Sequence, residues 1–172
     1  DMLADGVGGF LVTSESNVYG LGLSVAQAGE VNGDGYGDVI IGTPNSNTQY
    51  YVPSYCVSGH YLPDTYEYIC DQVGGGYTIT YNNVGRAYVV YGKPDTNPVS
   101  AAALSSGVGG FAIDGAFEYS QLGSSVSGAG DVNGDGFSDV IVGARNFDAG
   151  SESRPGAAFV LFGAATAPAS PV

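Results

Sequence analysis

Short apolar stretches separated by glycine-rich polar turns recur along the chain. Two β-branched runs, 39–41 and 140–142, each follow a polar loop, and longer apolar stretches lie at 86–91 and 158–162. Runs of this length, rich in Val, Ile and aromatic residues, are typical of strands rather than helices. The pattern predicts an all-β chain of short antiparallel strands.

This pattern is itself repeated. Residues 6–42 align without a gap with residues 107–143, and residues 85–92 align with residues 156–163. The two offsets are 101 and 71 positions, so the first repeat carries 30 extra residues. Internal repeats of short strands with glycine-rich turns are typical of propellers, solenoids and arrays, in which one unit cannot bury its own apolar face.

A polar loop of the same design lies in the middle of each repeat, at 30–38 and 131–139. Positions 1, 3, 5 and 9 carry an acid, Asn, Asp and Asp, whose oxygen atoms can converge on Ca²⁺, and position 7 can offer a backbone carbonyl. Gly at position 6 suits the sharp turn of such a loop. We predict two Ca²⁺ sites, with the ligands Glu30, Asn32, Asp34, Tyr36 and Asp38 in the first and Asp131, Asn133, Asp135, Phe137 and Asp139 in the second.

The loops differ from an EF-hand and from each other. An EF-hand needs Glu at position 12 and flanking helices, but position 12 is Ile41 or Val142, inside an apolar run. The alternative is an acidic turn that binds no metal, in which six carboxylates in two matching frames would repel one another. Glu30 stands where the second loop has Asp131, and its longer side chain is expected to weaken the first site or change its geometry.

Three motifs together resemble an FG-GAP repeat: GSSVSGAGDVNGDG at 123–136, DVIVGA at 139–144 and FVLFG at 159–163. This repeat is the blade unit of integrin α-subunit β-propellers and of many bacterial surface proteins. Dockerins share the DVNGDG core but continue into helices. The resemblance covers nearly the whole chain apart from the insertion and the tail. It implies extracellular β-propeller blades, in which a Ca²⁺ loop joins the first two strands and the metal mainly rigidifies that loop.

Strand counting indicates that the propeller is incomplete. The first blade is expected to have four strands and the second only three, at 21–25, 38–41, 86–91 and 110–113 and at 122–126, 139–142 and 158–162. A propeller closes with about four to eight blades, so two blades cannot form the ring. One N-terminal segment, aligned with 110–113, has no blade of its own; it consists of Gly9, Phe10, Leu11 and Val12.

We therefore predict that this segment pairs with the open blade edge of a neighbouring subunit. Such a head-to-tail contact gives a ring if its rotation closes and a filament if it does not. Two alternatives remain open. The two blades form a compact unit with the N-terminal segment folded back, or the chain is a piece of a longer array.

The predicted domains are repeat 1 at 1–92, with an insertion at 44–84; repeat 2 at 93–163, including its leading strand; and a Pro, Ala and Ser-rich tail at 164–172. The tail resembles a flexible or O-glycosylated linker. The insertion contains both cysteines, and an even pair in a secreted-type chain most simply forms one disulfide. That disulfide would join Cys56 and Cys70, with two free thiols as the alternative.

The insertion is also rich in tyrosine, a residue that recognition surfaces use because it offers large amphipathic contact area. Carbohydrate stacking, a protein contact and a purely structural role are all open. Eight of the 13 tyrosines lie there: Tyr50, Tyr51, Tyr55, Tyr61, Tyr66, Tyr68, Tyr77 and Tyr81.

Charge and composition narrow the function. Seventeen acidic residues against four basic ones give a net charge of −13, which argues against binding to nucleic acid or anionic membranes. No apolar run approaches the roughly 18 residues of a membrane helix. No Ser, Cys and His form a nucleophile pattern, so we expect no enzyme.

The resulting hypothesis is a Ca²⁺-stabilised subunit, extracellular or at the cell surface, with a structural or adhesive role. It would act through contacts with copies of itself or with another surface protein. The alternatives are a carbohydrate-binding module that uses the Tyr-rich insertion and binds a glycan, and an accessory module of a larger secreted protein.

Overall fold

The computed structural model describes residues 8–14, 16, 18–53, 55–61, 68–148 and 154–165. The chain separates into two compact units. The larger unit combines Asp1–Asn47 with Asn82–Val172, and the smaller unit is Thr48–Tyr81. The smaller unit therefore lies within the sequence insertion of the first repeat.

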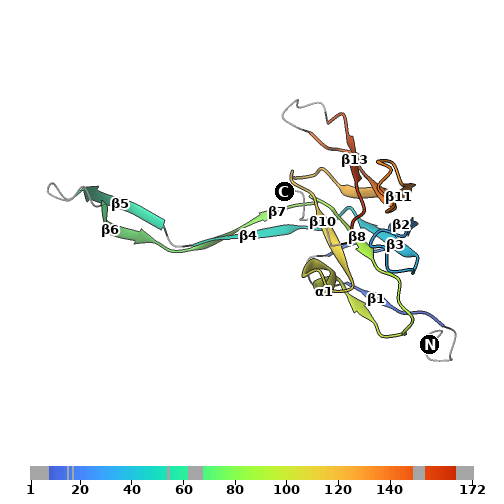
Figure 1. Ribbon diagram of the computed structural model, residues 1–172. Helices are drawn as coiled ribbons and strands as arrows, with labels where there is room; N and C mark the ends of the chain where they lie inside the picture. Colours follow the sequence, from blue (N-terminus) through green and yellow to red (C-terminus); the bar gives the residue numbers. More distant parts are fainter. Residues whose placement is uncertain are drawn as a thin grey trace. The chain divides into compact units, whose positions relative to one another are not determined.

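The first blade, in the larger unit, is a four-stranded antiparallel sheet in the order β10-β8-β3-β2 (Figure 1). Its strands are β2 (Ser24–Gly29), β3 (Asp38–Thr43), β8 (Arg86–Val90) and β10 (Gly110–Asp114). Each contains or overlaps one of the four strands expected from the apolar pattern. The prediction of a four-stranded first blade is confirmed.

The second blade is a three-stranded antiparallel sheet in the order β11-β12-β13. Its strands are β11 (Leu122–Gly130), β12 (Asp139–Ala144) and β13 (Ala157–Leu161). Within the part of the chain that the structure describes, β13 pairs only with β12. Among the described residues, the second blade therefore lacks a fourth strand, as the sequence predicted. The two sheets do not close into a ring.

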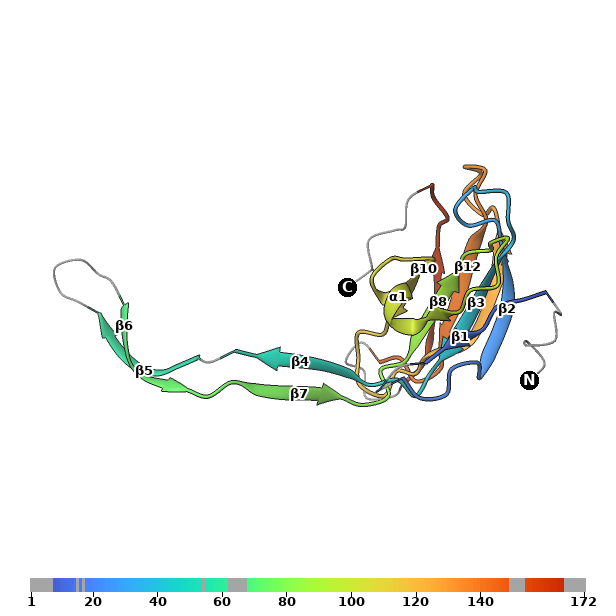
Figure 2. The same cartoon turned by 90° about the horizontal axis from the view of Figure 1, so that it is seen from below.

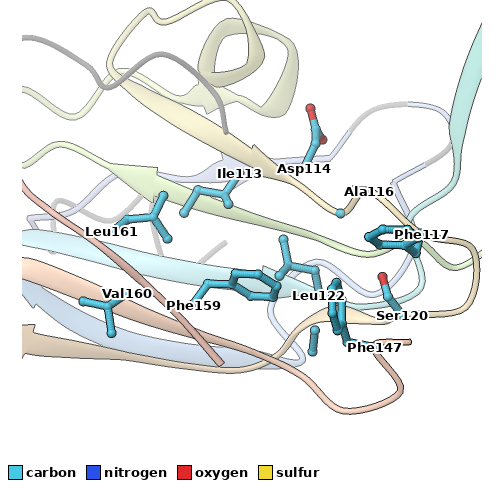
Figure 3. A pocket seen from close by; sticks show the side chains of 12 residues that line it. Ile113, Asp114, Ala116, Phe117, Ser120, Leu122, Phe147, Phe159, Val160 and Leu161 are labelled. Carbon is cyan, nitrogen blue, oxygen red and sulfur yellow. The ribbon is translucent and has the colours of Figure 1, made fainter. Parts of the chain in front are cut away.

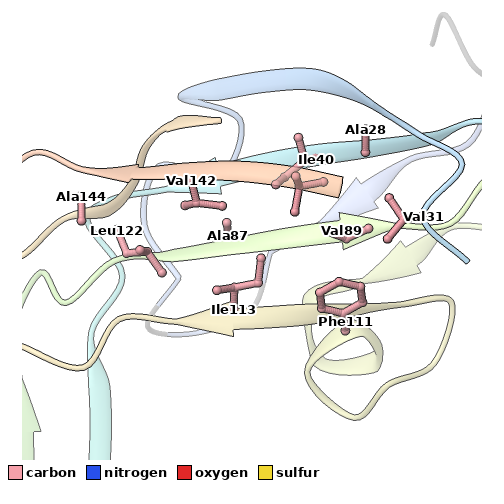
Figure 4. Close-up of a cluster of buried hydrophobic side chains, with 11 residues drawn as sticks. Ala28, Val31, Ile40, Ala87, Val89, Phe111, Ile113, Leu122, Val142 and Ala144 are labelled. Atoms are coloured by element: carbon pink, nitrogen blue, oxygen red, sulfur yellow. The ribbon is translucent and has the colours of Figure 1, made fainter. Parts of the chain in front are cut away.

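An apolar core lies between the two blades (Figure 4). Ile40 and Val89 come from the first blade and face Val142 of the second, and all three are fully buried. A second view shows the two blades as adjacent layers (Figure 2). This interblade core comprises Ala28, Val31, Ile40, Ala87, Val89, Phe111, Ile113, Leu122, Val140, Val142 and Ala144.

The other face of the first blade is covered by a short helix and by the N-terminal segment. The helix α1 (Ala101–Ser105) begins at Ser100, whose Oγ accepts a hydrogen bond from Ala103 N at 3.1 Å. Leu104 of the helix packs with Tyr88 and Val90 of β8. No helix within the described residues is long and apolar enough to cross a membrane.

The N-terminal segment lies against its own chain, as one of the open alternatives foresaw. Strand β1 (Val12–Thr13) pairs in parallel with β9 (Val99–Ser100), and Leu11 O accepts a hydrogen bond from Val99 N at 2.9 Å. Phe10 and Val12 pack against the cluster around Tyr88. Only two residue pairs form this ladder, so the segment is held mainly by side-chain packing.

The smaller unit is a two-stranded ribbon with two antiparallel ladders. Strands β4 (Thr48–Val52) and β7 (Tyr77–Tyr81) form one ladder, and β5 (Tyr55–Tyr61) and β6 (Tyr68–Gly74) form the other. The register places Cys56 opposite Val73 and Cys70 opposite Gly59. The cysteine side chains lie outside the described part of the structure, so the disulfide stays a prediction.

Candidate metal centres

Each polar loop joins the first two strands of its blade. Loop 1 (residues 30–38) leads from β2 to β3, and loop 2 (residues 131–139) leads from β11 to β12. The glycine at position 6 has a positive φ in both, 90° for Gly35 and 95° for Gly136. A side chain disfavours this conformation, which explains why both repeats use glycine there.

The last carboxylate of each loop is buried, and each of its two oxygen atoms accepts one backbone hydrogen bond. Asp38 is 1% exposed; its Oδ2 accepts from Val31 N at 2.7 Å and its Oδ1 from Gly92 N at 2.8 Å. Asp139 does the same with Val132 N at 2.7 Å and Gly163 N at 2.9 Å. Position 9 therefore ties the start of the loop to the end of the blade's third strand.

The glycine partners in this arrangement lie outside the two polar loops, so the ligand pattern of the loops did not predict them. Gly92 and Gly163 follow equivalent aromatic residues at the end of the third strand, as Tyr-Gly and Phe-Gly. This aromatic-glycine dipeptide, shared by both repeats, is the feature of the sequence that could have identified the two glycines. A Cβ at Gly92 would meet Gly37 O, and one at Gly163 would meet Ser138 O, so each glycine allows the strand end to approach its loop closely.

The other acids of loop 1 turn toward the loop's own backbone. Glu30 Oε1 accepts from Gly35 N at 2.8 Å, and Asp34 Oδ1 accepts from Tyr36 N at 2.8 Å. Asn32 Nδ2 donates to Asp34 Oδ2 at 2.8 Å, while Asn32 Oδ1 accepts from Asp34 N at 3.2 Å. Positions 1, 3 and 5 thus direct oxygen atoms into one small turn.

Loop 2 has the same pattern with a tighter first position. Asp131 Oδ1 accepts from Gly134 N at 2.7 Å and Asp135 N at 3.1 Å, and its Oδ2 accepts from Gly136 N at 2.9 Å. Asp131 therefore makes three contacts with its loop, whereas the longer Glu30 makes one. The first acid of each loop is therefore hydrogen-bonded differently to its loop.

The pKa values of two carboxylates in loop 1 are shifted in opposite directions. Burial raises the pKa of Asp38, and the nearby charges of Asp34 and Glu30 raise it further, against hydrogen bonds from Gly92 and Val31 that lower it. The pKa of Asp34 is lowered, chiefly by its hydrogen bond with Asn32. A divalent cation among these carboxylates would offset the repulsion that opposes ionisation of Asp38.

The donor set suits Ca²⁺, although the carboxylates do not surround one point. Among the described residues, no group of three or more His, Cys, Asp and Glu side chains has the arrangement of a metal centre. Each loop nevertheless offers carboxylate, amide and peptide oxygen atoms, the hard ligands that Ca²⁺ prefers. An ionised carboxylate also has about four lone-pair sites, so the existing hydrogen bonds leave capacity for a metal.

The two loops lie next to each other at one end of the blades. Ser138 N in loop 2 donates to Glu30 O in loop 1 at 2.8 Å. Ala164 N donates to Val31 O at 2.9 Å. Backbone hydrogen bonds therefore connect loop 1 both to loop 2 and to the residues that follow the third strand of the second blade.

A second candidate site lies away from the loops, at the open edge of the second blade (Figure 3). Phe159 and Val160 of β13 are 37% and 46% exposed. They border an apolar cavity of about 220 Å³ that Ile113 and Phe117 of the first blade also line. Large exposed apolar side chains that gather in this way mark an interaction site.

Two antiparallel blades, each with an oxygen-rich loop between its first two strands, define a propeller-type repeat protein. The family model of the FG-GAP repeat matches residues 21–54 and 122–161. These two segments therefore match the FG-GAP repeat, and the resemblance seen in the motifs of the chain is confirmed. No curated protein matches the chain.

Proposed function

We propose that this chain is a Ca²⁺-stabilised extracellular structural or adhesive subunit that acts through protein contacts. It assembles head to tail, as a filament or a ring, by donating its N-terminal segment to the open blade of a neighbour. The observation that carries the proposal is the exposed apolar edge of β13. The equivalent strand β8 is covered on the same side by β10.

Calcium contributes by making the loops rigid rather than by chemistry. The buried Asp38 and Asp139 already connect each loop to a strand end. A cation held by the outer acids would stiffen the loop around this connection and neutralise part of the −13 charge. FG-GAP repeats are typical of extracellular proteins, and Ca²⁺ is abundant outside the cell. No catalytic activity is expected.

Sedimentation velocity and negative-stain electron microscopy of the full chain test the proposal. We expect filaments or closed rings in millimolar Ca²⁺, and dissociation with loss of thermal stability in EDTA. Monomers at all concentrations in Ca²⁺ would overturn self-assembly. An unchanged melting temperature in EDTA would overturn the role of Ca²⁺ separately.

Glycan binding is a second candidate, favoured by the exposure of tyrosines in the smaller unit. Tyr51 is 65% exposed and Tyr81 is 39% exposed. Aromatic rings presented in this way can stack on sugar rings. A glycan array tests this function. Binding that is lost in Tyr51→Ala but retained in the control Tyr19→Ala, in the larger unit, would support it. No binding by the native chain would reject it.

A third candidate is an accessory module of a larger secreted protein. A longer reading frame around this sequence would support it.

A further inference from the structure

The first blade shows which strand fits beside the third strand of a repeat. Strand β10 pairs antiparallel with β8, with Phe111 opposite Val89 and Ala112 opposite Tyr88. Strand β13 repeats β8 at an offset of 71, and residues 9–13 repeat β10 at an offset of 101. Strand β13 and residues 9–13 are thus related in sequence to β8 and β10, which already pair in the first blade.

We propose that β13 of one copy binds residues 9–13 of a second copy as an antiparallel fourth strand, with the Leu11 side chain seated in the apolar cavity of the second blade. The inference rests on the proposed self-assembly and names its acceptor site and register. Transferred from the first blade, that register places Phe10 opposite Val160 and Leu11 opposite Phe159.

Among the described strands, β13 pairs along one edge only, so its other edge can accept a donated strand. Tyr91 N donates to Gly109 O at 3.0 Å, so this position of the first blade faces β10. Backbone groups alternate between the two edges of a strand, so Val89 faces the same way. The equivalent groups of Phe162 and Val160 then face the open edge of the second blade, where a donated strand would satisfy them.

Side-chain alternation selects Leu11 for the cavity. In the first blade, Ala112 and Tyr88 are opposite each other and lie on the same face of the sheet. By the same relation, Leu11 shares a face with Phe159, which lines the cavity. Leu11 is also larger than Ala112, the equivalent residue of β10, so its side chain can fill more of the cavity.

The donor segment is already arranged for this contact. Leu11 is 48% exposed, whereas Phe10 and Val12 pack against their own first blade. Because Leu11 O faces β9 through its bond with Val99 N, the backbone groups of Phe10 and Val12 face the opposite edge. Leu11 can therefore be buried in a neighbour while its flanking residues keep their present packing.

The charges are compatible with the proposed pairing. At the end of the β8 and β10 pair, Arg86 forms an ion pair with Asp114. The equivalent positions in the proposed pair are Ala157 and Thr13, both uncharged. Donation therefore buries no unpaired charge at this position, which would otherwise oppose association.

Sedimentation velocity of variants of the N-terminal segment tests whether Leu11 occupies the cavity of a second copy. Leu11→Asp should weaken self-association in Ca²⁺ at least about 100-fold, because a carboxylate would enter an apolar cavity. The matched control is Val108→Asp, at an apolar position that is 64% exposed in the turn after α1. Val108→Asp should change association less than about twofold. Equal association of the two variants would overturn the proposal.

Cysteine cross-linking tests the register directly, in a background with Cys56→Ser and Cys70→Ser. In the first blade, backbone hydrogen bonds join Val89 to its partner, so the next pair, Ala112 and Tyr88, exchanges none. The equivalent pair, Leu11 and Phe159, should therefore have Cα atoms about 4.5 Å apart. Leu11→Cys combined with Phe159→Cys should give covalent multimers on non-reducing gels. Leu11→Cys with Ala158→Cys, one residue out of register, should give few.

The outcomes separate this inference from the proposed function. Assembly of native protein that persists in Leu11→Asp, without cross-linking at the predicted pair, would overturn the strand register and leave self-assembly standing. Monomeric native protein in Ca²⁺ would overturn both. Cross-linking only at the shifted pair would overturn the pairing of Leu11 with Phe159.

Discussion

The third strands of the two blades have related sequences and different surroundings. Tyr88 and Val89 of β8 are fully buried, whereas Phe159 and Val160 at the equivalent positions of β13 are 37% and 46% exposed. Strand β10 and helix α1 cover β8. No described strand covers the outer edge of β13. The same apolar motif is thus core in one blade and exposed edge in the other, because its neighbours decide its burial.

The loops show the opposite relation. Asp38 and Asp139 have the same buried position and the same pair of backbone donors, although one blade is complete and the other is not. The hydrogen bonds of these two carboxylates all lie within their own blade. We therefore expect the blades to behave alike in their loops and differently at their third strands, and four experiments challenge or refine that comparison.

The largest effect is expected from the buried loop carboxylates, and it should be the same in both blades. Asp38→Ala and Asp139→Ala should each lower the free energy of unfolding by about 4 kcal/mol in EDTA, because each leaves one buried and one partly buried N–H group without an acceptor. Urea denaturation measures this. Asp34→Ala, which removes an exposed carboxylate, is the control and should cost less than about 1 kcal/mol. A loss confined to one blade would contradict the shared geometry.

Removal of Ca²⁺ should have the next largest effect. At a free concentration 100 times Kd, each occupied site stabilises the fold by about 2.7 kcal/mol. Asp135→Ala should remove the contribution of loop 2 and leave that of loop 1. Scanning calorimetry in Ca²⁺ and in EDTA gives both values. Full calcium stabilisation in a variant that also carries Asp34→Ala would show that the metal binds elsewhere.

Valine truncation compares the third strands with the chemistry held constant. Val89→Ala should cost about 2 kcal/mol of unfolding free energy, because it deletes two fully buried methyl groups. Val160→Ala should cost less than about 0.5 kcal/mol in the monomer. Chemical denaturation at low protein concentration measures both. Equal losses would mean that β13 is covered in solution.

The smallest effect concerns position 1 of the loops. Glu30→Asp should raise the Ca²⁺ affinity of loop 1 by up to about tenfold, which is about 1.4 kcal/mol. The shorter side chain can adopt the three-contact arrangement of Asp131. Isothermal titration calorimetry measures the change, and Asp131→Glu should shift loop 2 in the opposite direction. Weaker binding by Glu30→Asp would show that loop 1 is adapted to Glu.

The sequence by itself determined the local features of this protein. The seven blade strands, the two polar loops and a second blade of only three strands among the described residues follow from apolar runs, glycine positions and the repeat. These features depend on residues close together in the chain. Their prediction therefore did not require knowledge of which segments meet.

Only the tertiary structure decided the long-range partners. Asp38 could be named as a loop acid, but its bond with Gly92 spans 54 positions and determines that the carboxylate is buried. The position of the N-terminal segment against β9 was likewise one of several open alternatives. The cavity beside Phe159 arises because Ile113 of the other blade forms its opposite wall. Contacts between distant segments are set by packing, which a repeat pattern alone does not specify.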